Sequence, residues 1–381
     1  IPLSCAARRN AKAREGGVTI AWIQTRLAGL AAVAAVAGGL AAQPAGTLAA
    51  ETETEAVGTG ATGTGGVSLD NGAVGVMYHR FGDGRYPSTN IRMNQFEAHI
   101  EELEKDKYNV LPLPEIVEAF AEGRELPPYT VAITVDDAYL SLYENAWPVL
   151  KEAGFPFTLF VATQPVDSGS SNYMSWDQIR EIADSDLVTI GSQAHEHPHM
   201  PAQSAAANLA DLRESQDRFK AELGQAPDLF AYPYGEYSES VVQVVREIGF
   251  QAAFGQHSGA MARTMDRFKL PRYAMNESYG DMDRFRLAIN ALPLPVHDVT
   301  PSDNKLTPAN NPPRYGFTVD ESVGSLRSLN CFASGAGKVK TEILGSQRVE
   351  VRMDRPFGAG RARINCTLRD SSGRWRWFGN Q

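Results

Sequence analysis

The clearest pattern along the chain is an alternation of short apolar runs with longer amphipathic segments. From Ala73 to about residue 291, runs such as AVGVMY, TVAITV and FTLFVA precede stretches with apolar residues at helical spacing. Strands and helices in alternation predict parallel strands covered by helices. About seven such units favour a barrel. A doubly wound open sheet is the competing architecture, but no glycine-rich phosphate loop follows the first run.

Beyond residue 291 the period of the apolar pattern changes. The segments Arg348–Met353, Ala362–Leu368 and Arg374–Phe378 alternate apolar and polar residues, which predicts β-strands. A proline-rich stretch separates them from the helical part of the chain. We therefore expect a barrel over residues 73–291, a linker over residues 292–314 and a small β domain over residues 315–381.

The first fifty residues have the pattern of a secretory signal. Basic residues precede an apolar stretch from Leu27 to Ala42. With about 16 residues this stretch is short for a membrane span, so we expect a signal over residues 1–50, with an uncleaved anchor as the alternative. The long basic run before Val18 indicates that translation starts near that residue. Residues 51–72, rich in Glu, Thr and Gly, predict a flexible linker.

Composition and charge limit the cellular compartments and the binding partners that we expect for this protein. The 36 basic and 45 acidic residues give a net charge of -9, which offers no basic surface for a nucleic acid. The signal pattern predicts an exported protein of the periplasm, cell envelope or medium, without stable membrane insertion once the signal is removed. Cys5 lies in the signal region, which leaves Cys331 and Cys366 as the candidate disulfide pair in an oxidising compartment. Two free buried thiols are the alternative.

Candidate chemical groups follow two of the predicted strands. Asp136 and Asp137 end the run TVAITVDD, at the edge of a barrel where active sites lie. Two adjacent carboxylates repel each other, and a metal ion compensates that repulsion. His195, His197 and His199 follow the run VTIGS, and imidazole nitrogens are common metal ligands. An exposed acidic turn and a solvated histidine-rich loop are the structural alternatives.

A third strand ends in the turn Pro233, Tyr234 and Gly235, which can direct a backbone N–H into the cleft. Taken in order, the three elements resemble the polysaccharide deacetylase family, the NodB-homology carbohydrate esterases. Their motifs run T-F-D-D-G, H-[ST]-x-x-H and R-x-P-Y-G, and the resemblance extends from about Val74 to Ala291. It implies a distorted (β/α)7 barrel and metal-dependent removal of acetyl groups from N-acetylated sugars.

The resemblance also implies a role for each matching residue. Asp136 corresponds to the general base, and Asp137 to a metal ligand. In the register set by the residues after the strand, Gln193 and His197 take the places of the two metal-binding histidines. Tyr234 would donate its backbone N–H to the oxyanion. The implied cofactor is a divalent metal, with zinc the expected ion, and the implied substrate is an N-acetylated polysaccharide.

The chain departs from the family pattern at several positions. Gln193 places an amide where the family has an imidazole, and a register shifted to His195 and His199 is the alternative. Ala231 stands where the family has an arginine that orients the base. No Leu-x-His motif supplies the usual general acid, so His257 is the first candidate and His79 the second.

Alternative hypotheses remain for the function and for the role of the aromatic residues. A degenerate barrel that has lost its metal through Gln193 would be a non-catalytic glycan-binding protein, and the same barrel can act on another amide or ester. Trp176, Trp375 and Trp377 could stack on sugar rings, although tail tryptophans are more often part of a small sheet's core.

Overall fold

The computed structural model describes residue 68 and residues 70–381. The expected signal over residues 1–50 lies outside the described residues, as does most of the expected linker over 51–72. Among the helices that the structure describes, none is long and apolar enough to cross a bilayer.

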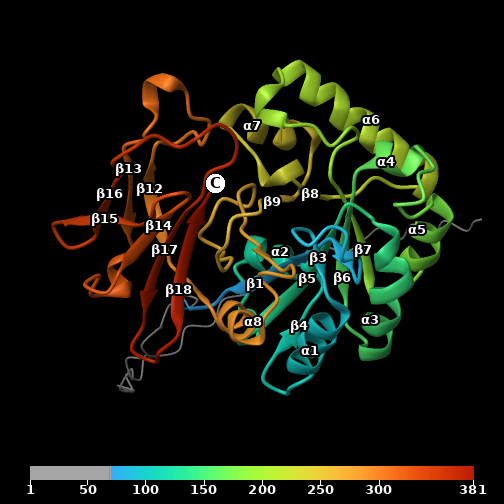
Figure 1. The fold of residues 1–381 in the computed structure, drawn as a ribbon, viewed down its shortest axis with the longest axis horizontal. Coiled ribbons are helices and arrows are strands. Elements are labelled where there is room, and N and C mark those ends of the chain that lie inside the picture. Colours follow the sequence, from blue (N-terminus) through green and yellow to red (C-terminus); the bar gives the residue numbers. More distant parts are fainter. Residues whose placement is uncertain (1–67, 69) are drawn as a thin grey trace, which may run out of the picture. The chain divides into compact units, whose positions relative to one another are not determined.

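The first part of the chain forms a curled sheet of parallel strands, which confirms the predicted distorted barrel (Figure 1). Strands β1 and β5 are buried along their whole length, because helices cover one face of the sheet and the barrel interior covers the other. A single parallel bridge, between Phe254 and Leu270, links the strand at one end of the sheet to the segment that leads into the strand at the other end. In sheet order the strands are β10 (Tyr273–Ala274), β1 (Ala73–Tyr78), β5 (Thr130–Asp136), β6 (Phe157–Val161), β7 (Val188–Ser192), β8 (Leu229–Ala231) and β9 (Ala252–Phe254), and β4 (Asn109–Val110) also pairs with β5.

Helices connect the barrel strands and bury their apolar faces against the sheet. They are α1 (Met93–Leu103), α2 (Leu113–Glu122), α3 (Trp147–Ala153), α4 (Thr163–Asp167), α5 (Trp176–Ala183), α6 (Ala205–Leu223), α7 (Glu239–Ile248) and α8 (Met282–Ile289). A π-helical turn (Leu142–Ala146) precedes α3, and a small two-stranded sheet of β2 (Arg80–Phe81) and β3 (Asn90–Ile91) follows β1. The alternation of strands and helices predicted from the sequence is therefore observed.

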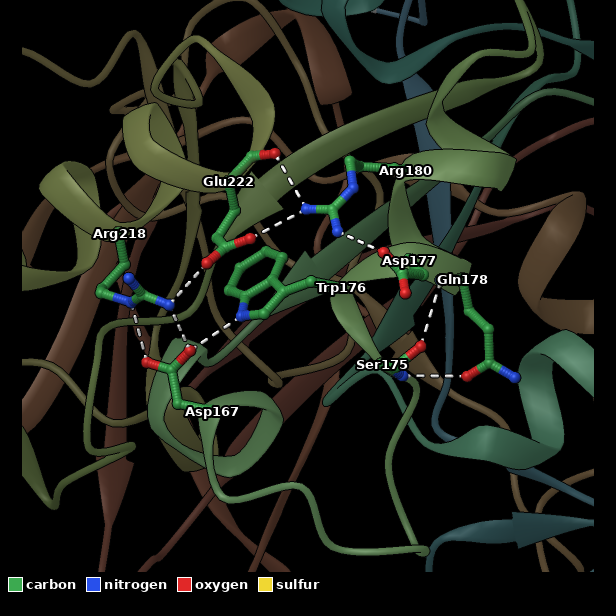
Figure 2. Close-up of polar contacts among 8 residues, drawn as sticks. All are labelled: Asp167, Ser175, Trp176, Asp177, Gln178, Arg180, Arg218 and Glu222. Atoms are coloured by element: carbon green, nitrogen blue, oxygen red, sulfur yellow. Dashed lines mark hydrogen bonds and ion pairs between the residues drawn. The ribbon is translucent and has the colours of Figure 1, made fainter.

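The start of α5 is fixed by its first residues. Ser175 accepts a hydrogen bond from the Gln178 N–H, and the Gln178 side chain accepts one from the Ser175 N–H (Figure 2). This reciprocal pair satisfies two backbone donors that the helix itself leaves free.

The last part of the chain forms a second sheet, as the period-two pattern predicts. Its strand order is β11 (Leu292–Pro293), β18 (Trp375–Asn380), β17 (Ile364–Arg369), β14 (Asn330–Ala333), β15 (Gly337–Leu344), β16 (Arg348–Arg352), β13 (Tyr315–Val319) and β12 (Val296–Thr300). All pairs are antiparallel except that of β11 and β18. We expected a linker over residues 292–314. Its first half instead contains β11 and β12, which belong to this sheet. Proline residues concealed those two edge strands in the sequence pattern.

A disulfide joins two neighbouring strands of the second sheet. Cys331 on β14 lies directly opposite Cys366 on β17, and their sulfur atoms are 2.02 Å apart. Both residues are fully buried. The disulfide expected from the sequence is therefore present in the structure.

Candidate active site

Three strand ends bring the candidate residues together. Strands β5, β7 and β8 are parallel members of one sheet, so their carboxyl ends meet at the same edge. Asp136 ends β5 and Asp137 follows it, Gln193 and His197 follow β7, and Tyr234 follows β8. The structure thus places all five residues at one edge of the barrel.

Asp136 forms a fully buried ion pair with Arg272. The two guanidinium Nη atoms lie 2.6 and 2.9 Å from the two carboxylate oxygens, and both side chains are completely excluded from solvent. Arg272 also donates to the Thr134 hydroxyl and to the Gly255 carbonyl. This planar, bidentate contact fixes the orientation of the carboxylate.

Arg272 is a functional residue that the sequence reasoning missed. Ala231, which stands where the family has its arginine, left the base without an orienting partner. The structure supplies that partner from just before β10, 136 positions after Asp136. The available signal was a single arginine inside the apolar run KLPRYA, because a charged residue in a buried strand requires a buried partner.

Asp137 and His197 face each other at the strand edge. The His197 Nε2 atom lies 3.4 Å from the Asp137 Oδ1 atom, and both atoms are buried without a hydrogen-bond partner. Buried polar atoms are rarely left unpaired. Zinc–ligand distances of about 2.0–2.2 Å place two ligands of one tetrahedral ion about 3.4 Å apart. The pair therefore fits two ligands of a divalent metal.

Gln193 lies between the two aspartates. Its Oε1 atom accepts the Asp137 N–H at 3.2 Å, and its Nε2 atom lies 3.5 Å from Asp136 Oδ2. The same Asp137 N–H donates to the Phe160 carbonyl at 2.9 Å, so the amide oxygen keeps accepting capacity. Within the described residues no cluster of three or more His, Cys, Asp and Glu side chains could hold a metal, so a third ligand must be of another type, and this amide oxygen is the candidate.

The other two histidines of the loop point to different partners. His195 Nδ1 contacts the Thr163 hydroxyl at 2.7 Å, and its backbone N–H donates to Asp211. His199 Nδ1 contacts Glu236 at 2.8 Å. Only His197 reaches Asp137, and this geometry favours the register with Gln193 and His197 over the shifted register.

Tyr234 sits at the centre of a tight turn (Pro233–Gly235) with a left-handed backbone, at φ 58°. The turn is closed by the N–H groups of Gly235 and Glu236, so closure does not use the Tyr234 N–H. The Tyr234 carbonyl accepts hydrogen bonds from Arg361 at 3.0 Å and from Gln381 at 2.9 Å. The second sheet therefore holds the residue that the family resemblance assigns to the oxyanion.

Left-handed backbone conformations are concentrated around the site. The non-glycine residues with positive φ include Asp137, Ala138, Ala194, His197 and Tyr234. Such conformations cost about 1–3 kcal/mol each and persist only where the surrounding structure enforces them. The barrel edge thus holds the side chains of Asp137 and His197 in positions that relaxed loops would not adopt.

Two tyrosines add protonated hydroxyl groups beside Asp137. Burial raises the pKa of Tyr139, and the negative charge of Asp137 raises it further. Burial and then Asp137 also raise the pKa of Tyr234. The guanidinium of Arg80 lies 3.3 Å from the centre of the Tyr139 ring. These phenols stay protonated at neutral pH and present donors, not charges, to the site.

His257 is not placed as a general acid requires. Its side chain is 1% exposed and lies beside the Tyr237 ring. Burial, together with the nearby Arg363 charge, lowers its pKa to about 3, so the ring is neutral at pH 7 and lacks the imidazolium proton that a general acid donates. His79 is half-buried and directly follows β1. Tyr78, the last residue of β1, pairs with Val135 of β5, so the next residues in register on the two chains are His79 and Asp136. Of the two expected candidates, the second is better placed.

Trp176 is engaged in a polar network instead of forming an open stacking surface. Its indole Nε1–H donates to Asp167 (Figure 2). Its ring packs edge-on against Phe219. Asp167 also pairs with Arg218, which contacts Glu222. The expected sugar contact of Trp176 is not supported, because the network binds α4, α5 and α6 to one another.

Comparison with known proteins identifies the barrel. Residues 123–253 match the family model described as polysaccharide deacetylase. A putative polysaccharide deacetylase of Bacillus subtilis, YxkH, is 25% identical over 197 residues, which cover 52% of this chain and 69% of the relative. A poly-beta-1,6-N-acetyl-D-glucosamine N-deacetylase of Staphylococcus aureus is 23% identical over 235 residues, which cover 55% and 80% of the two chains.

Solved structures share the same fold. The deacetylase PplD of Streptococcus pyogenes, in complex with acetate, aligns with a TM-score of 0.53 at 19% identity and covers 57% of this chain and 98% of its own. IcaB from Ammonifex degensii aligns with a TM-score of 0.50 at 25% identity and covers 57% and 97%. With the motifs at the strand ends, these matches show that the barrel is similar to polysaccharide deacetylases, in sequence over residues 123–253 and in fold.

Proposed function

We propose that this chain is a metal-dependent hydrolase that removes N-acetyl groups from an N-acetylated polysaccharide outside the cytoplasm. The observation that carries the proposal is the adjacency of an arginine-held carboxylate, Asp136, to the unpaired atoms of Asp137 and His197. Relatives named as deacetylases support the same reaction. The signal pattern over residues 1–50 supports export.

The metal is assigned to Asp137, His197 and the amide oxygen of Gln193. When bound there, a divalent ion such as zinc polarises the acetyl carbonyl and lowers the pKa of a water molecule. Gln193 provides a weaker ligand for zinc than imidazole does, so we expect modest zinc affinity and better competition from metals that prefer oxygen.

The protein groups supply the remaining steps. Asp136 accepts the proton of the attacking water, and Arg272 keeps its carboxylate in one orientation. The Tyr234 N–H donates to the oxyanion that forms at the acetyl carbon. His79, next in register to Asp136, protonates the departing sugar nitrogen, so that acetate and a free amine are the products.

One specific observation favours a second candidate function. Gln193 replaces a histidine, and its oxygen already accepts the Asp137 N–H. If the remaining ligands do not retain a metal, the barrel would bind glycans without hydrolysing them.

Acetate release from a panel of N-acetylated glycans distinguishes the two functions. The assay is run with zinc, with cobalt, with manganese and with a chelator. We expect metal-dependent release that the chelator abolishes and that His197→Ala removes, while His195→Ala retains it. Binding of a glycan without any acetate release, in every metal, would favour the binding protein.

His79→Gln tests the assignment of the proton donor. We expect the variant to lose turnover on the amide substrate but to retain it on an acetyl ester, whose leaving group does not need protonation. Equal turnover of both substrates by the variant and the wild type would remove His79 from the mechanism.

A further inference from the structure

A large cavity lies beside the candidate active site. Its volume is about 950 Å³, within the range of about 300–1,000 Å³ that is typical of ligand pockets. One wall comes from the barrel turns that carry His199, Glu236 and Tyr237. The other wall comes from residues 301–313 and 356–364 of the second-sheet region, outside the matched family segment 123–253.

A chain of ring contacts connects the cavity lining to the candidate site. His199, which lines the cavity, stacks on the Tyr234 ring with 4.1 Å between ring centres and an angle of 11°. The Tyr234 ring in turn lies edge-on to His197 at 4.5 Å. Arg361, also in the cavity lining, donates to the Tyr234 carbonyl. A ligand in the cavity therefore lies against His199 and Arg361, both of which contact Tyr234.

The charged groups of the cavity already have protein partners. Glu236 contacts His199 at 2.8 Å, Arg361 donates to Tyr234, and Lys305 donates to the Pro201 carbonyl at 2.6 Å. Glu236 offsets part of the charge of Arg361 and Lys305, so the lining is not a concentrated cationic site and favours an uncharged ligand over a polyanion.

Apolar and amide groups form the rest of the lining. Proline side chains and the ring of Phe357 offer flat apolar surfaces, and Asn304, Asn380 and Gln381 offer amides. Asn304 donates only one of its two amide hydrogens to Asn380, at 2.8 Å, so the pair retains hydrogen-bonding capacity. Sugar rings present apolar C–H faces, methyl groups of acetamides and neutral hydroxyl groups, which match both kinds of surface.

We propose that this cavity binds the sugar units next to the unit being deacetylated, so that the chain acts on an oligomeric or polymeric N-acetylated glycan and not on a single sugar. The inference rests on the proposed function, because it takes the reacting acetamide to lie at Asp136 and Asp137. It assigns the second sheet a role in substrate binding that the barrel alone does not provide.

Filling the cavity tests the proposal. Ala359 lines the cavity and is exposed, so Ala359→Trp places a bulky ring in it; Ala121→Trp, at an exposed position of α2, is the matched control. Substrates are two-unit and five-unit oligosaccharides of the glycan that the wild type deacetylates. We expect Ala359→Trp to raise KM for the five-unit substrate about tenfold or more, and to raise KM for the two-unit substrate less, because that substrate places fewer sugar units in the cavity.

A second variant guards against misfolding of the first. A side chain at Gly358, also in the lining, meets no atom within 4 Å at its Cβ, so Gly358→Trp is compatible with the fold. Thermal unfolding establishes that each variant is folded. An unchanged KM for the five-unit substrate in a folded cavity-filled variant would overturn the inference, with the wild type still active.

Failure of the proposed function has a different signature. If the wild type releases acetate from no glycan, titration calorimetry with the same oligosaccharides replaces the kinetic assay. Binding that strengthens with length and that Ala359→Trp weakens would keep the cavity as a glycan site while the hydrolase proposal fails. Binding equal in Ala359→Trp and Ala121→Trp would overturn the cavity as well.

Discussion

Arg272 and Asp136 form a bidentate ion pair inside the barrel although 136 positions separate them in the chain. In the sheet, only β1 lies between β5, which ends in Asp136, and β10, which begins one residue after Arg272. The parallel topology therefore brings together the proposed base and the cation that orients its carboxylate, from segments far apart in the chain. A buried charge of either sign is costly alone, so each residue explains why the other is tolerated.

Asp136→Asn should abolish catalysis and also destabilise the fold. Loss of the proton acceptor predicts a fall in acetate release of about a hundredfold or more. The variant leaves Arg272 as an uncompensated buried charge, which costs about 3–5 kcal/mol in the free energy of unfolding. Urea denaturation measures this loss. Asp136→Asn combined with Arg272→Met should recover part of it, and a single variant that unfolds at the wild-type midpoint would contradict the argument.

The sequence predicted the features that depend on hydrophobic periodicity and on the positions of the strand ends. The alternation of strands and helices predicted the barrel. Residues in the segments after parallel strands, such as Asp137 and His197, were expected to meet at one edge of the sheet. Arg272 was missed because its partner lies far away in sequence and no local spacing links them. The strands at 292–293 and 296–300 were missed because prolines in and beside them hide the alternating pattern, and because their partner strands lie more than fifteen residues further along the chain.

Gln193→His should strengthen zinc binding about tenfold or more, because an imidazole nitrogen suits zinc better than an amide oxygen does. Gln193 is fully buried between the aspartates, so a histidine there replaces a side chain that already points into the site. Competition titration with a zinc-binding dye measures the affinity. His197→Ala should abolish binding and His195→Ala should leave it near the wild-type value. Loss of binding in His195→Ala but not in His197→Ala would support the alternative register, with His195 and His199 as ligands.

Reduction of the disulfide should weaken the second sheet. The bond between Cys331 and Cys366 closes a loop with a sequence separation of 35 residues, which corresponds to about 4 kcal/mol in the free energy of unfolding. Denaturation curves with and without a reductant measure the difference. In a Cys331→Ala, Cys366→Ala variant, reductant should cause no further shift. Thiol labelling of the unfolded, unreduced protein without residues 1–50 should find no free cysteine.

His257→Gln should retain acetate release at neutral pH and make the protein less sensitive to acid. Burial lowers the pKa of His257 to about 3, whereas the unfolded chain titrates near about 6.5. Between these values the unfolded state binds the proton more tightly, so wild-type stability falls as pH decreases from about 6.5 to 3. Urea midpoints across this range measure the slope, which should be shallower in the variant. Loss of turnover with an unchanged slope would return His257 to the mechanism.

Arg361→Ala should slow the chemical step although Arg361 lies outside the barrel. Its guanidinium holds the Tyr234 carbonyl at 3.0 Å, and its loss frees a turn whose left-handed backbone presents the oxyanion donor. On a two-unit glycan we expect kcat to fall about tenfold with KM little changed, because a misplaced donor affects the transition state more than substrate binding. Arg361→Lys should recover part of kcat, since it keeps one donor. Arg355→Ala, which removes an exposed arginine that contacts only the Gly335 carbonyl among the described hydrogen bonds, is the matched control and should behave as the wild type. A normal kcat in folded Arg361→Ala would show that the barrel holds the Tyr234 turn without help from the second sheet.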